Sequence, residues 1–278
     1  MIRINNLSFG YSKKKLLYNN LSLSMERGKI YGLLGKNGAG KSTFLKNISG
    51  LLFPLKGNIS VFGTEPRRRL PSFLKNIYLI PEEVYVPAIS VSRYVKIFPP
   101  FYPKFNKEHF HQYLNELEVD FDSNLKTLSF GQQKKFIIAF ALACNTGLIL
   151  LDEPTNGLDI PSKAQFRRLI ASIMNEERII LISTHQTRDL ENLIDSILII
   201  DEGKLLLNAS MDKISQKLDF KTLKELPNIE EILFSVSSFG GYSVVLQNSN
   251  NQHNQINLEH LFNAVIQKPE AISKIFLS

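Results

Sequence analysis

Nine consecutive residues near the start of the chain have the types and spacing that bind phosphate. The first eight follow the pattern G-x-x-x-x-G-K-[ST], in the order Gly35, Lys36, Asn37, Gly38, Ala39, Gly40, Lys41 and Ser42, and Thr43 comes directly after them. The glycines permit positive φ angles and a close backbone approach, so that successive N–H groups can point at one anion. In this pattern Lys41 holds β- and γ-phosphate oxygens, and the hydroxyl of Ser42 binds Mg²⁺.

The residues on both sides of this loop supply the context that the pattern requires. A mostly apolar run, residues 30–34, precedes it and predicts a buried strand, while Phe44, Leu45 and Ile48 have helical spacing. A helix that begins here adds its partial positive charge to a phosphate site. The alternative is a glycine-rich turn between a strand and a helix that binds no ligand.

Two acids follow a second apolar run. Asp152 and Glu153 end the run 148–151, which has the continuous apolar character of a strand buried on both faces. Open α/β sheets bind their ligands at the carboxyl ends of such strands. Asp152 therefore fits an acid that holds Mg²⁺, and Glu153 fits a group that polarises an attacking water. The alternative is a strand that ends in solvated acids.

Two ring side chains are further candidates. His185 follows the predicted buried strand 179–183 and would face the same crevice, although a lone histidine at a strand end is often structural. Tyr11 lies upstream of the phosphate loop, where an aromatic ring can stack on a purine base. An ordinary tyrosine at the end of a strand is the alternative.

A second anion site is predicted at the head of an apolar helix. The sequence Leu128-Ser129-Phe130-Gly131-Gln132-Gln133 precedes the apolar residues of that helix. A serine and a glycine at a helix N-terminus can bind an anion by the same physics as the phosphate loop. A plain N-cap is the alternative.

Composition limits the class of protein. The chain has 278 residues, 44% hydrophobic and 21% charged, and no apolar run reaches the length of a membrane span. The N-terminus lacks a secretory apolar region, so we expect a cytosolic chain, and the single cysteine, Cys144, excludes an internal disulfide framework. The net charge of +7 permits nucleic acid or an anionic membrane as a partner, but the basic clusters 13–15 and 67–69 resemble solvated loops.

The elements that must position these residues predict an α/β fold with a phosphate-loop NTPase core. Strands at 2–9 and 16–25 predict an antiparallel β subdomain, and residues 84–145 predict a helical insertion. The apolar pattern changes after residue 210. We therefore predict a nucleotide-binding domain over 1–210 and a small C-terminal α+β extension over 211–278.

With all these motifs in order, the first 210 residues or so resemble the nucleotide-binding subunit of an ABC transporter. The resemblance implies ATP as ligand and two domains that dimerise head to tail, each capping the other's ATP. Tyr11 then corresponds to the adenine-stacking aromatic, Glu153 to the catalytic base and His185 to the switch histidine. Further implied contacts are those of Ser129, Gly131 and Gln132 with the γ-phosphate of the partner's ATP, and of Asp159 with the dimer partner.

Two positions depart from the family pattern. Phe130 stands where the family usually has glycine, which is compatible with capping only if its side chain points away from the phosphate. Glu82 stands where the family has a glutamine that contacts metal and water, and a carboxylate still offers an oxygen to Mg²⁺. The segments 81–83 and 101–103 resemble a bacterial subgroup that pairs with ABC-2-type membrane subunits.

The resemblance implies an ATPase at the cytoplasmic face of the membrane. It would form a homodimer, drive separately encoded membrane-spanning subunits and bind no nucleic acid. Two alternatives remain open from the sequence. One is a soluble ABC ATPase of the cluster-assembly type, and the other is a binding module in which nucleotide is only a regulatory ligand.

Overall fold

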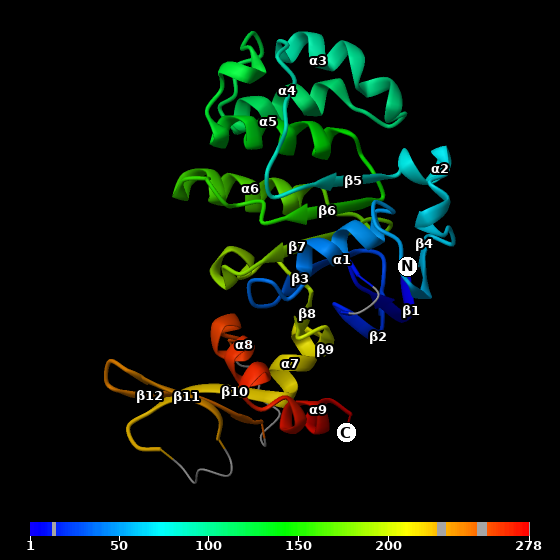
Figure 1. Cartoon of the computed structure of the whole chain (residues 1–278). Helices are drawn as coiled ribbons and strands as arrows, with labels where there is room; N and C mark the ends of the chain where they lie inside the picture. The colour runs from blue at the N-terminus through cyan, green and yellow to red at the C-terminus, as the bar shows by residue number, and fades with distance from the viewer. Residues whose placement is uncertain (13–14, 227–231, 249–254, 278) are drawn as a thin grey trace.

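The computed structural model describes residues 1–12, 15–226, 232–248 and 255–277. Lys13 and Lys14 of the first basic cluster lie outside the described residues. The chain forms a central sheet with a helical region at one end and the C-terminal extension at the opposite end (Figure 1). This arrangement has the α/β core, antiparallel subdomain, helical insertion and α+β extension that the sequence predicts.

The central sheet is mostly parallel and positions the site. Its strand order, with bounds, is β5 (Ile77–Ile80), β6 (Leu148–Asp152), β7 (Ile179–Thr184), β3 (Lys29–Leu34), β8 (Ser196–Asp201) and β9 (Lys204–Ser210). All neighbours are parallel except β9, which pairs antiparallel with β8. Every residue of β6 and β7 is buried, as expected for strands covered on both faces.

One face of this sheet packs on a smaller antiparallel sheet and a helix. The small sheet has the order β2 (Tyr18–Met25), β1 (Ile2–Phe9) and β4 (Lys56–Val61). Together with α1 (Lys41–Ile48) it forms a hydrophobic cluster that includes Phe44, Leu150 and Leu181. Because strand side chains alternate between faces, Ile149 and Ile180 belong to a second cluster on the opposite face.

Helices cover the opposite face and continue into the helical insertion. They are α3 (Val91–Ile97), α4 (Lys107–Glu116), α5 (Phe130–Ala143) and α6 (Ile160–Ser172), whereas Phe73 of the short helix α2 (Pro71–Leu74) packs in the cluster on the first face. Aromatic rings fill the insertion: Phe140 of α5 lies within 6.2 Å of the rings of Tyr94, Tyr102 and Phe105. This packing explains why aromatic residues are concentrated in this part of the sequence.

The C-terminal extension combines a three-stranded sheet with helices. Its elements are α7 (Met211–Lys217), β10 (Leu218–Leu223), β11 (Ile232–Ser238), β12 (Gly241–Gln247), α8 (Leu258–Gln267) and α9 (Pro269–Leu277). The strand order is β10-β12-β11. Leu261 and Val265 of α8 are fully buried in the same hydrophobic cluster as Ile197 and Ile199 of β8. The extension therefore shares a core with the central sheet.

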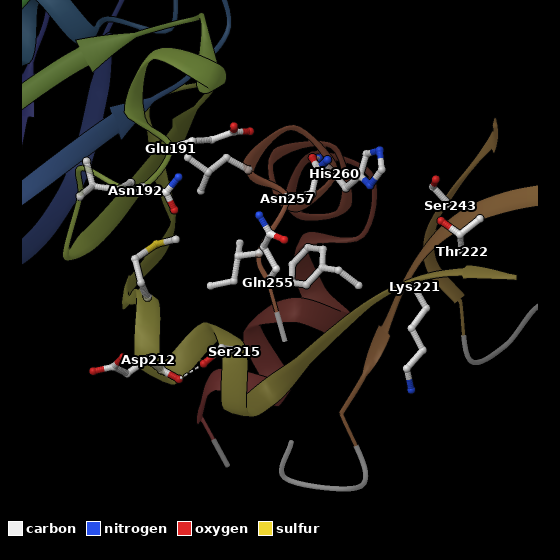
Figure 2. Close-up of a pocket in the computed structure, with 15 residues that line it drawn as sticks. Glu191, Asn192, Asp212, Ser215, Lys221, Thr222, Ser243, Gln255, Asn257 and His260 are labelled. Atoms are coloured by element: carbon white, nitrogen blue, oxygen red, sulfur yellow. Dashed lines mark hydrogen bonds between the residues drawn. The ribbon is translucent and has the colours of Figure 1, made fainter. Parts of the chain in front are cut away.

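A cleft of about 870 Å³ lies where the extension meets the core (Figure 2). Its lining includes Glu191 and Asn192 from the core and Asp212, Thr222 and His260 from the extension. No glycine-rich loop lines it among the described residues. No helix in the described part of the chain combines the length and the apolar character that crossing a membrane requires.

Candidate nucleoside triphosphate site

The order of the strands brings the candidate residues together. Strand β3 leads into the phosphate loop, β6 ends in Asp152 followed by Glu153, and β7 ends in Thr184 followed by His185. Strands β6, β7 and β3 are consecutive neighbours and parallel, so their carboxyl ends meet at one edge of the sheet. Between them lies a cleft of about 590 Å³, lined by phosphate-loop residues and by Tyr11, Glu82, Asp152, Glu153 and His185.

The backbone of the phosphate loop depends on its glycines. Gly38 and Gly40 have φ angles of 81° and 101°, which side chains rarely allow. A Cβ on Gly40 would also lie 2.5 Å from the hydroxyl of Tyr18. That buried hydroxyl donates a hydrogen bond to the carbonyl of Gly40, so β2 supports the loop from behind. Helix α1 starts at Lys41, directly after this glycine.

The ammonium group of Lys41 lies at the centre of the site. Its Nζ donates to the carbonyl of Gly35 at 2.9 Å and lies 3.8 Å from Oε1 of Glu153. Burial lowers the pKa of Lys41, and the carboxylates of Glu153, Asp152 and Glu82 oppose that shift. A nearly buried cation facing an open cleft is suited to an anionic ligand such as a phosphate group.

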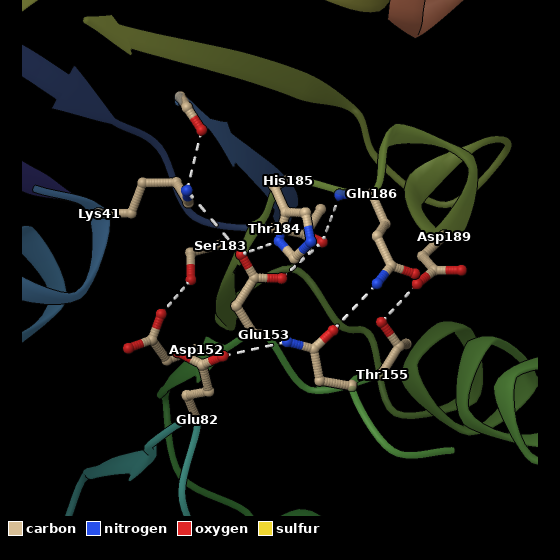
Figure 3. Close-up of polar contacts among 12 residues, drawn as sticks. Lys41, Glu82, Asp152, Glu153, Thr155, Ser183, Thr184, His185, Gln186 and Asp189 are labelled. Carbon is tan, nitrogen blue, oxygen red and sulfur yellow. Dashed lines mark hydrogen bonds and ion pairs between the residues drawn. The ribbon is translucent and has the colours of Figure 1, made fainter. Parts of the chain in front are cut away.

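The carboxylate of Glu153 is fixed by side chains from β7 and the residue after it (Figure 3). Oε2 accepts a hydrogen bond from Oγ1 of Thr184 at 2.9 Å, and Oε1 lies 2.9 Å from Nδ1 of His185. The backbone of Glu153 has a φ of 45°, in the left-handed region. Left-handed non-glycine residues are uncommon and cluster at functional sites. The structure thus brings Lys41, Glu153 and His185 together, as the sequence predicts.

The oxygen ligands suited to a hard cation line the same cleft. The Ser42 side chain and the carboxylates of Asp152 and Glu82 are among its lining residues. Asp152 accepts a hydrogen bond from the Ser183 hydroxyl, its register partner on β7, while Glu82 accepts one from Asn156 Nδ2 at 3.1 Å. Hydroxyl and carboxylate oxygens fit Mg²⁺, which commonly binds through one or two carboxylates together with phosphate oxygens.

Tyr11 lies at the mouth of the cleft with most of its ring exposed. Its side chain is 71% exposed and its hydroxyl is 2.9 Å from Oγ1 of Thr43 in the phosphate loop. The ring packs against Phe9 in a T-shaped contact, with the ring centres 5.3 Å apart. This position is compatible with the predicted stacking on a base.

The predicted second anion site lies elsewhere. Ser129, Gly131, Gln132 and Asp159 are not among the described residues that line the phosphate-loop cleft. Ser129 is the N-cap of α5 and forms a reciprocal capping box with Gln132. Asp159 caps α6 by accepting from the N–H of Ser162 at 2.9 Å, and hydrogen bonds from Ser162 lower the pKa of Asp159.

The side chain of Phe130 turns back onto its own chain. A Cβ on Gly157 would lie 2.9 Å from the Phe130 ring, so the ring lies directly against that glycine. The Nζ of Lys134 lies 5.6 Å from the centre of the same ring. The ring is therefore held against the loop that follows β6, although the residue is 48% exposed.

Sequence reasoning missed several residues that connect the loops around the cleft. The amide of Asn156 donates to Glu82 Oε1 and accepts from Gln186 Nε2, both at 3.1 Å. Lys163 donates to Gln186 and to Asp189 at distances of 2.8 and 2.9 Å. Lys134 is fully buried inside α5. Lys134 lies on the apolar face of this helix, because it precedes Ile137, Ile138 and Ala141 by three, four and seven residues. That spacing could have identified it as a buried lysine.

A phosphate loop, a strand-end pair of acids and a histidine around one cleft of a parallel sheet define a phosphate-loop nucleoside triphosphatase. Comparison with known proteins identifies the family. Residues 18–156 match the model of the ABC transporter family, to which this chain belongs. It is the ATP-binding subunit of an ABC transporter and an ATPase.

Similar proteins cover most of the chain. The lantibiotic transport ATP-binding protein SrtF of Streptococcus pyogenes is 34% identical over 84% of this chain and 98% of its own length. The bacitracin transport ATP-binding protein BcrA of Bacillus licheniformis is 32% identical over 78% of this chain and 72% of its own. A solved ATP-binding subunit of an ABC transporter, 25% identical, superposes with a TM-score of 0.70 over 77% of this chain and 91% of its own.

Proposed function

We propose that this ATPase drives separately encoded membrane-spanning subunits and acts as a homodimer with two shared ATP sites. Each site would combine the phosphate loop of one copy with Ser129, Gly131 and Gln132 of the other. Asp159 would contact the partner near the same site. The chain would lie at the cytoplasmic face of the membrane without spanning it, and it would bind no nucleic acid.

The position of residues 129–132 carries this proposal. Ser129 and Gln132 are exposed at the start of α5 and are absent from the lining of their own phosphate cleft. The N-terminus of a helix favours an anion, and this one lies outside the phosphate cleft of its own chain. A second copy turned head to tail would place this helix end on the γ-phosphate. The orientation of Phe130 toward Gly157 is compatible with such a cap.

The geometry supports in-line attack of water on the γ-phosphate. Glu153 would accept a hydrogen bond from the water and receive its proton, while Thr184 and His185 hold the carboxylate in place. Lys41 and the loop N–H groups would stabilise the charge on the phosphate oxygens. Ser42, Asp152 and Glu82 would hold Mg²⁺, which neutralises charge on the β- and γ-phosphates. Tyr11 would stack on the adenine.

We also propose that the membrane partner is of the ABC-2 type and that the complex is an exporter. The segments 81–83 and 101–103 support the subgroup. One relative, described as the SkfA peptide export ATP-binding protein and 30% identical over 80% of this chain, supports export.

The dimer is tested with the Glu153→Gln variant, which keeps the shape of the site while slowing hydrolysis. With Mg²⁺ and ATP, its molar mass by light scattering should double from 31.6 kDa, and without nucleotide it should not. Lys41→Ala in the same background is the control and should stay monomeric. A Glu153→Gln protein that binds ATP at saturation and remains a monomer would contradict the shared site.

A further inference from the structure

A lysine with no carboxylate partner is buried behind the catalytic carboxylate. Lys134 of α5 has no exposed surface, and among the described residues it forms no ion pair. Buried ammonium groups are costly unless their hydrogen bonds are satisfied. Burial lowers the pKa of Lys134, and the carboxylates of Glu82, Glu153 and Asp152 oppose that shift. A residue type this costly at a buried position indicates a specific role.

The ammonium group of Lys134 binds the main chain of the catalytic loop. Its Nζ donates to the carbonyl of Glu153 at 2.7 Å and to the carbonyl of Asn156 at 3.1 Å. The N–H of Glu153 donates to the carbonyl of Ser183 at 3.0 Å. The left-handed backbone of Glu153 is therefore held on both sides, from β7 through its N–H and from α5 through its carbonyl.

The same lysine connects this loop to the start of α5. Helix α5 begins one turn before Lys134, at the capping box of Ser129 and Gln132. The Phe130 ring covers the ammonium group from that end and lies against Gly157 of the loop. A shift of the α5 start can thus reach the Glu153 backbone through a buried, hydrogen-bonded contact rather than through solvent.

We propose that Lys134 is a positioning residue that fixes Glu153 for attack on the γ-phosphate and couples its orientation to the start of α5. This inference rests on the proposed role of Glu153 in hydrolysis. Lys134 touches neither the nucleotide cleft nor the reacting atoms, so it acts through the Glu153 backbone.

The test is a double-mutant cycle on ATP turnover. Lys134→Met removes the ammonium group and keeps an unbranched chain, and kcat should fall about 10- to 100-fold, as misplacement of a catalytic group typically costs. KM for ATP should stay within about twofold, because substrate contacts are unchanged. In the Glu153→Gln background the same substitution should change residual turnover by less than about twofold.

A matched control and a second variant keep the test decisive. Lys135→Met, the next residue on the helix, should leave kcat within about twofold in both backgrounds. If Lys134→Met does not fold, the cycle is run with Lys134→Gln, whose amide is one atom shorter and still donates to one carbonyl. That variant should show a smaller loss of kcat, again with KM unchanged.

Three results would overturn the inference: no loss of kcat, a loss confined to KM, or an equal loss in both backgrounds. Failure of the proposed function has a different signature. In that case the parent protein would show no ATP turnover, or Glu153→Gln would hydrolyse ATP like the parent.

Discussion

Glu153 illustrates how much of this site depends on single side chains. The residue is 5% exposed. Its carboxylate accepts a hydrogen bond from Thr184 and lies beside His185 and Lys41. Because Glu153, Thr184 and Lys41 are buried, their contacts orient the carboxylate more strongly than they would at the surface. The acid pair was predictable from sequence, but Thr184 was not, since threonine at a strand end has many roles.

We predict that Glu153→Gln and Lys41→Ala each slow ATP turnover by at least about 10²–10³-fold, the usual cost of losing one preorganised catalytic group. Glutamine cannot take the proton of the attacking water, and alanine removes the cation facing the phosphates. Phosphate release by the purified protein measures both. A Glu153→Gln protein with parental turnover would exclude Glu153 as the base.

The start of α5 has two possible roles at the scale of the element. Ser129 caps the helix, which is sufficient to explain a serine there, and the proposed dimer gives it a second role on the partner's phosphate. Stability and turnover separate these roles, because only the cap contributes to folding of the monomer.

We predict that Ser129→Ala lowers the free energy of unfolding by about 0.5–2 kcal/mol and that Ser129→Asp, which still caps, restores most of it. ATP turnover should nevertheless be low in Ser129→Asp, because its carboxylate would repel the partner's γ-phosphate. Urea unfolding and phosphate release are the two measurements. If turnover recovers with stability in the aspartate variant, the serine serves the cap alone.

Elements with contiguous patterns were predictable, whereas contacts between elements were not. The phosphate loop and the strand before Asp152 are each recognisable within a few consecutive residues. Asn156 instead joins Glu82, 74 positions away, to Gln186, 30 positions away. Those contacts exist because β5, β6 and β7 are neighbours, and strand order cannot be read from one segment at a time.

At the scale of the molecule, the C-terminal extension shares its core with the nucleotide-binding part. Leu261 of α8 is fully buried in the cluster that contains Ile197 and Ile199 of the central sheet. The proposed boundary at residue 210 therefore separates two patterns of sequence while one hydrophobic cluster crosses it.

We predict that Leu261→Ala destabilises the whole chain by about 2–5 kcal/mol, because it leaves a cavity in this shared core. Thermal unfolding followed by a fluorescent ATP analogue in the phosphate cleft should shift to lower temperature together with far-UV circular dichroism. Leu226→Ala, at a 43% exposed position in the extension, is the matched control and should shift neither signal. If the nucleotide signal of Leu261→Ala melts at the parental temperature, the extension folds independently.

The whole molecule is proposed to assemble with a membrane-spanning partner. The relatives that are ATP-binding subunits of transporters support the proposed membrane-spanning partner. A tagged form of the chain, recovered from detergent-solubilised membranes of its own host, should retain a polytopic membrane protein. That protein should remain bound to the Lys41→Ala variant, because this substitution affects phosphate binding and leaves the remaining surface intact. Recovery with cytosolic proteins alone, and no chain in the membrane fraction, would contradict the proposed membrane partner and still leave the ATPase site as described.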